Sequence, residues 1–201
     1  MPLVWASLAG PERPAGRPPV SSVGALAPLP AEQARRLQRS VGAYLAFQAF
    51  HGANFAWPVF VAFYQRVVGL GLAEVLYLQS FHTVVRVALE IPLGVLADRV
   101  GRRTALALSA GAQALACLIL LLMPWWPAVV VAEMCFAVAV ASRSGADGAL
   151  LFDLLTAHGR TADYPHVEGR AQSLMALAGA AAALASGFLA SIWLALPYAA
   201  T

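Results

Sequence analysis

The sequence predicts an all-α membrane protein: a helical bundle of five transmembrane helices followed by the start of a sixth. Composition is the first observation, because 60% of the 201 residues are hydrophobic and only 11% are charged. Soluble domains carry about 25% charged residues, so this chain lacks the charge to cover itself with a solvated surface. The second observation is a series of apolar runs, each near the roughly 20 residues that a membrane-crossing helix needs. Backbone groups in lipid must be satisfied within the segment, which makes these runs helices.

The chain is expected to divide at residue 40. Residues 1–30 hold seven of the thirteen prolines, and proline at that density prevents a continuous helix. Residues 31–40, AEQARRLQRS, then supply three arginines. We therefore predict a disordered proline-rich cytoplasmic tail with a basic lead-in over 1–40, and an incomplete transmembrane bundle over 41–201.

Five apolar segments define the predicted helices, in order about 41–63, 74–97, 104–123, 128–149 and 171–194. The fifth is crowded with alanine, glycine and serine, and such small residues permit close helix packing. The sixth helix is expected to begin at LPYAAT, residues 196–201, where the sequence ends.

Arginine placement predicts the topology, because cytoplasmic loops carry an excess of positive charge. Eight arginines fall within residues 31–40 or in the loops after the second and fourth helices, whereas one lies in the loop between the first two helices. The N-terminus and both basic loops are therefore expected in the cytoplasm, and the protein in the cell membrane. The eight are Arg35, Arg36, Arg39, Arg99, Arg102, Arg103, Arg160 and Arg170, and the other is Arg66.

The stretch GVLADRVGRR, residues 94–103, crowds four charges into the turn after the second helix. Gly94 would let another helix backbone approach closely, and Gly101 would allow a turn that larger residues resist. Asp98 would cap a neighbouring helix and pair with an arginine. From these residues alone, an ordinary positive-inside loop remains an equal alternative.

The same stretch resembles the signature between helices 2 and 3 of major facilitator superfamily transporters, glycine–x–x–x–aspartate–arginine–x–glycine–arginine–arginine. Its fixed positions fall on Gly94, Asp98, Arg99, Gly101, Arg102 and Arg103. RSGADGALLFDLL at 143–155 and YPHVEGRAQS at 164–173 resemble the end of helix 4 and the entry to helix 5 in one subgroup. The resemblance covers about 41–201. It implies the N-terminal half of such a transporter, with a missing C-terminal half as partner and the signature as a cytoplasmic gate.

Polar side chains inside the predicted helices are the candidates for a solute cavity or for proton coupling, because ionisable residues in a bilayer are costly. Arg86 and Glu90 lie four apart in the second helix, hence on one face, and Arg143 and Asp147 repeat that spacing. His51 and Asn54 in the first helix and His82 in the second are also polar enough to line a cavity. Fixed ion pairs and a packed histidine are the alternatives. Glu133 is interpreted as interfacial.

Three functions follow from this sequence. The first is a secondary transporter of a small solute, present as an incomplete half. The second is an intramembrane enzyme, suggested by ADGALLFD at 146–153, but the further paired aspartates of such a metal site are missing. The third is a non-transporting membrane scaffold, a dimerising protein or a truncated gene product. We expect the lipid bilayer and an unknown small solute as partners, and no nucleic acid. We do not expect the protein to be an enzyme or to bind a cofactor or a metal.

Overall fold

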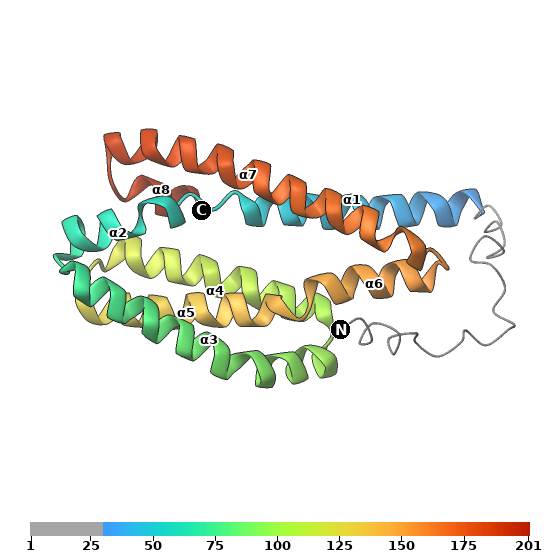
Figure 1. Ribbon diagram of the computed structural model, residues 1–201, viewed down its shortest axis with the longest axis horizontal. Coiled ribbons are helices and arrows are strands. Elements are labelled where there is room, and N and C mark those ends of the chain that lie inside the picture. Colours follow the sequence, from blue (N-terminus) through green and yellow to red (C-terminus); the bar gives the residue numbers. More distant parts are fainter. Residues whose placement is uncertain (1–29) are drawn as a thin grey trace, which may run out of the picture. The chain divides into compact units, whose positions relative to one another are not determined.

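The computed structural model describes residues 30–201, and the elements in this range are all helical (Figure 1). The predicted disordered tail over 1–29 lies outside the described residues, whereas the basic lead-in over 31–40 is part of the first helix. The elements are α1 (Ala31–Gly52), η2 (Trp57–Val59), α2 (Phe60–Phe63), η3 (Tyr64–Val68), α3 (Leu72–Val100), α4 (Arg102–Leu122), α5 (Trp126–Ser144), α6 (Asp147–Ala157), η4 (Thr161–Asp163), α7 (Tyr164–Ile192) and α8 (Leu196–Ala200).

Four helical segments are long and apolar enough to cross a membrane. They coincide with the second to fifth predicted helices, although the last includes the sequence YPHVEGR and does not begin after it. The fourth predicted helix is interrupted by a turn between α5 and α6. The four segments are Leu72–Val100, Arg102–Leu122, Trp126–Ala157 and Thr161–Ile192.

The prediction of one continuous helix over 41–63 is wrong. α1 ends at Gly52, and the chain continues through η2, α2 and η3. Pro58 explains the interruption, because proline has no N–H and its ring clashes with the carbonyl four residues earlier, here that of Asn54. The Asn54 side-chain oxygen accepts a hydrogen bond of 3.0 Å from the Trp57 N–H. This bond satisfies a donor at the start of the new helical turn.

Helices α1 and α7 lie side by side, and α5 packs against both α3 and α4 (Figure 1). Glycine makes the α1–α7 contact possible. A Cβ atom on Gly52 would overlap the backbone of Met175, and one on Gly179 would lie 3.3 Å from the Gly52 carbonyl oxygen. The small residues of the fifth predicted helix therefore do serve close packing, at least at Gly179.

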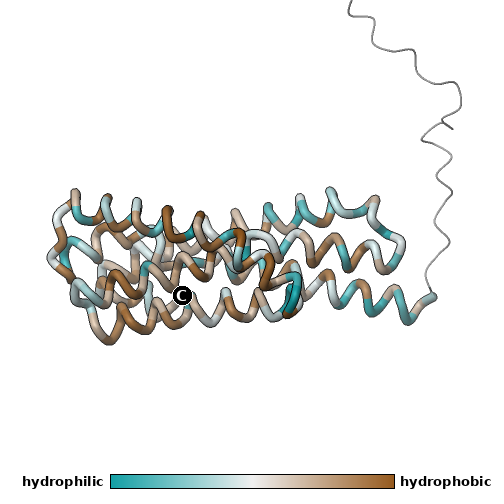
Figure 2. Tube along the Cα trace, turned by 90° about the horizontal axis from the view of Figure 1, so that it is seen from below, coloured by the Kyte–Doolittle hydropathy of each residue, from teal (hydrophilic) through white to brown (hydrophobic). Residues whose placement is uncertain are grey.

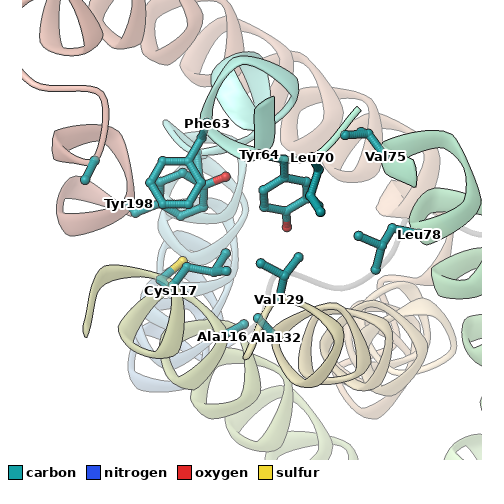
Figure 3. Close-up of a cluster of buried hydrophobic side chains, with 13 residues drawn as sticks. Phe63, Tyr64, Leu70, Val75, Leu78, Ala116, Cys117, Val129, Ala132 and Tyr198 are labelled. Atoms are coloured by element: carbon teal, nitrogen blue, oxygen red, sulfur yellow. The ribbon is translucent and has the colours of Figure 1, made fainter. Parts of the chain in front are cut away.

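The largest apolar core joins the η2–η3 connection to α3, α4, α5 and α8 (Figure 3). Phe63 and Tyr198 are its aromatic centre, with ring centroids 4.4 Å apart. Tyr198 belongs to α8, the start of the predicted sixth helix, and is buried. Two smaller clusters lie elsewhere: one joins α1, α6 and α7, and the other joins α3, α4 and the α5–α6 turn.

Successive long helices run in opposite directions, so the arginine-bearing start of α1, the turn between α3 and α4, and the connection between α6 and α7 lie toward one end (Figure 1). In Figure 2, hydrophilic residues are frequent toward the end where α1 begins, and hydrophobic stretches follow along the helices. Arg66 lies in η3, toward the other end. The charge asymmetry expected from the sequence is thus present in the arrangement of the helices.

Candidate functional site

A cavity of about 190 Å³ lies between the η2–η3 connection, α3, α4 and α5. Polar and aromatic side chains share its wall, although the surrounding helices are apolar. Four of the predicted candidates reach it: His51, Asn54, His82 and Arg86. The other lining residues are Ala56, Trp57, Phe60, Tyr64, Gln79, Gln113, Glu133, Phe136, Val140 and Tyr198.

Glu133 is the buried acid of this cavity, with only 3% of its surface exposed. Oε1 accepts hydrogen bonds from the Tyr64 hydroxyl at 2.6 Å and from Gln79 Nε2 at 3.2 Å. Oε2 lies 2.9 Å from His82 Nδ1. Glu133 is therefore buried inside the bundle and has three polar neighbours there. Its position in α5 places it opposite α3 and η3, a contact that no sequence spacing reveals.

Tyr64 reaches Glu133 from an irregular piece of backbone. It begins η3, a π-helical turn that follows directly on α2. The turn closes at Gly69, whose φ of +83° is in the left-handed region that favours glycine, and the Leu70 N–H donates to the Tyr64 carbonyl at 3.0 Å. Single π-turns are frequent at functional sites because they redirect one side chain.

Arg86 and Glu90 lie together, as their spacing predicts. The Arg86 Nε atom is 3.6 Å from Glu90 Oε1, and the two side chains are 40% and 39% exposed. Arg86 lines the cavity and Glu90 does not. The pair is thus half-buried at the cavity edge, and its two charges largely cancel one another.

Arg143 and Asp147 belong to a separate hydrogen-bond network, which lies away from the cavity and toward the end of the bundle where α1 begins. Arg143 Nη1 donates to Asp147 Oδ2 at 3.0 Å, and Gln48 Nε2 lies 3.5 Å from the same oxygen. Gln48 also donates to the Tyr44 hydroxyl at 2.9 Å, and Tyr44 in turn donates to Glu168 at 3.0 Å. This network ties α1 to α6 and α7. Tyr44 and Gln48 are four apart in α1, but their partners Glu168 and Asp147 lie 124 and 99 positions away, and no sequence spacing predicts those contacts.

The turn after α3 has the glycine geometry that the sequence predicts. Gly101 alone separates α3 from α4, with a φ of +93°. Arg102 forms an ion pair of 2.9 Å with Asp153 of α6, a partner not anticipated. Among residues 30–201, no cation lies within 4.0 Å of the Asp98 carboxylate, so the expected pairing of Asp98 with an arginine is absent from this range.

Gly94 lies near the same turn and was expected to admit a neighbouring helix. A Cβ atom at Gly94 would meet nothing within 4 Å in the described part of the chain. The close approach predicted there is therefore not made by any of the described helices. Arg99 and Arg103 are likewise without an acidic partner within 4.0 Å in this range.

The cavity is suited to holding a positive charge or a proton. A carboxylate withdrawn from water is costly unless it is paired and hydrogen-bonded, and here three side chains from two elements face it.

Within 30–201, no group of three His, Cys, Asp or Glu side chains has the geometry to hold a metal ion. No protein-family model, curated protein or solved structure matches the chain.

Proposed function

We propose that the chain forms part of a secondary transporter for small solutes, of the major facilitator type, with the cavity around Glu133 on the solute path. The observation that carries the proposal is this cavity, which sets a buried carboxylate among apolar helices. Ionisable residues at membrane depth are costly and mark solute or proton routes by default.

The interrupted backbone beside the cavity supports the same proposal. Non-helical backbone at membrane depth is tolerated only where it is buried in protein or lines a cavity, and transporter sites are typically formed by discontinuous helices. Here the chain leaves α1 after Gly52 and passes through η2, α2 and η3, which supply Trp57, Phe60 and Tyr64 to the wall.

Under this proposal the Gly101 turn is a cytoplasmic gate, and a second bundle completes the path. Asp98, Arg99 and Arg103 would then find their partners on that bundle. Helices α3 and α7 also carry large apolar side chains that no described residue covers, among them Tyr77, Ile91, Leu184 and Phe188. Such faces suit lipid or further helices.

The same open faces favour one alternative, a membrane scaffold that associates through α3 or α7 without passing a solute. The two functions differ in the access to the cavity. A transporter must open it alternately to the two sides of the membrane, whereas a scaffold has no need to open it to both.

Cysteine accessibility tests the proposal without knowledge of the solute. Gln113 of α4 lines the cavity and offers a site for Gln113→Cys, in a background with Cys117→Ala and Cys135→Ala. The protein would be expressed in its full reading frame, and right-side-out and inside-out vesicles would be treated with a membrane-impermeant maleimide. We expect labelling from both sides. Labelling from one side only, or from neither, would contradict transport and favour the scaffold.

A further inference from the structure

We infer that the cavity around Glu133 binds a small organic cation, a protonated amine with an apolar or aromatic body. This inference rests on the proposed function, because it names the class of solute. It is carried by charge, by the arrangement of aromatic rings and by the size of the cavity.

Glu133 is the one carboxylate that lines the cavity, and among residues 30–201 no arginine lies within 4.0 Å of it; its one ion-pair partner in that range is the imidazole of His82. Arg86 and Glu90 neutralise each other at 3.6 Å. Glu133 then has only the neutral donors Tyr64 and Gln79 and the imidazole of His82. A buried carboxylate that has no arginine partner favours a cation over a neutral solute or an anion.

Glu133 still has an acceptor position to offer. A carboxylate has about four lone-pair sites. Oε1 uses two of them for Tyr64 and Gln79, whereas Oε2 faces only His82. An ammonium group at Oε2 would therefore add a charge-assisted hydrogen bond, the stronger kind, without displacing an existing partner.

Aromatic rings form a continuous wall from the surface to this carboxylate. We call Trp57, Phe60 and Tyr64 the aromatic wall. Trp57 is 61% exposed and stacks on Phe60 with centroids 4.9 Å apart, and Phe60 meets Tyr64 edge-on at 5.9 Å. Tyr64 then donates to Glu133. Aromatic faces attract cations, so this wall offers an entering amine favourable contacts along its length.

The size of the cavity limits the ligand. A cavity of about 150 Å³ accommodates benzene, so the roughly 190 Å³ available here suits one ring with a short substituent. Benzylammonium has these dimensions and carries the required charge. Benzyl alcohol has the same ring and chain length without the charge, which makes it the matched control ligand.

The test is calorimetric titration of the purified full chain in detergent with benzylammonium and with benzyl alcohol. We expect the amine to bind at least about tenfold more tightly, from the ionic hydrogen bond and the ring contacts. Glu133→Gln should abolish that preference. Glu74→Gln, which changes a carboxylate bonded to the Gly71 N–H at the start of α3, should retain it.

Equal affinity for the amine and the alcohol, no detectable binding, or a preference that survives Glu133→Gln would overturn the inference. If Glu133→Gln does not yield folded protein, Trp57→Leu decides the matter, because the exposed Trp57 contributes little to the core. Trp57→Leu should weaken the binding of the amine more than the binding of the alcohol. An equal loss of affinity for both ligands would count against a cation site. Two-sided cysteine labelling without amine binding would overturn this inference and leave transport standing.

Discussion

The Tyr64 hydroxyl and the Glu133 carboxylate meet at 2.6 Å, although 69 positions separate them in the sequence. One residue comes from a π-turn after a broken helix and the other from the middle of a regular one. The contact joins the irregular η2–η3 connection to α5, and it sets the position of the acid in the cavity.

Removing the Tyr64 hydroxyl tests how much this contact stabilises the fold. Tyr64→Phe leaves Glu133 Oε1 with Gln79 alone, and an under-satisfied buried acceptor costs about 1–3 kcal/mol. Tyr77→Phe is the matched control, because Tyr77 lies on the open face of α3. Unfolding in mixed detergent and dodecyl sulfate micelles should show the loss for the first variant only. Equal stability of the two variants would mean that the hydrogen bond contributes nothing.

A methyl group at Gly52 should separate α1 from α7. The added Cβ atom of Gly52→Ala would overlap the Met175 backbone, and such overpacking costs about 1–3 kcal/mol. Gly42→Ala adds the same atom to the same helix where nothing lies within 4 Å, so it should be neutral or stabilising by up to about 1 kcal/mol. The same unfolding assay compares the two. A harmless Gly52→Ala would show that the two helices are not in contact at this point.

Asp98 and Asp153 should behave differently when they are neutralised. Asp153 pairs with Arg102 but is 57% exposed, so Asp153→Asn should cost at most about 1 kcal/mol. Asp98→Asn removes no ion pair within the described residues and should change the unfolding free energy by less than about 0.5 kcal/mol. If the turn is a gate, Asp98→Asn should nevertheless slow solute flux at normal expression. Normal flux would remove Asp98 from the gate.

The Arg86–Glu90 pair should cost more to break than to remove. Arg86→Leu or Glu90→Leu leaves one charge stranded at the cavity edge, and breaking a fully buried pair costs about 3–5 kcal/mol. The cost here should be smaller, because each side chain is about 40% exposed. Each single variant should lower the membrane yield, and the double variant should recover part of it. Losses that simply add would show that the two charges act independently.

Topology can be checked at the two ends of α4. With Cys117 and Cys135 replaced, Val100→Cys should react in intact cells only with membrane-permeant maleimides, because the arginines beside it favour the cytoplasm. Trp125→Cys, in the short connection after α4, should react with impermeant ones as well. Both positions are exposed, so access by the reagent is the only variable. The reverse pattern would invert the topology.

Hydrophobic run length was enough to predict four of the long helices, because a bilayer imposes one length on every span. It failed over 41–63, where Pro58 and Asn54 end a helix that hydrophobicity alone would continue. Arg86 with Glu90 was predictable, since helical periodicity brings such neighbours together. Arg143 and Asp147 pair as their spacing suggests, but they do so across the turn between α5 and α6. Glu133 was not predictable, because its partners arrive through tertiary packing from η3 and α3.

The single residue between α3 and α4 bears on how this chain is made. Gly101 is the only residue between the last turn of α3 and the first turn of α4. A connection this short favours insertion of α3 and α4 as one unit during biosynthesis. The two should therefore enter the bilayer together as a hairpin, with Arg102 and Arg103 holding its tip on the side of synthesis.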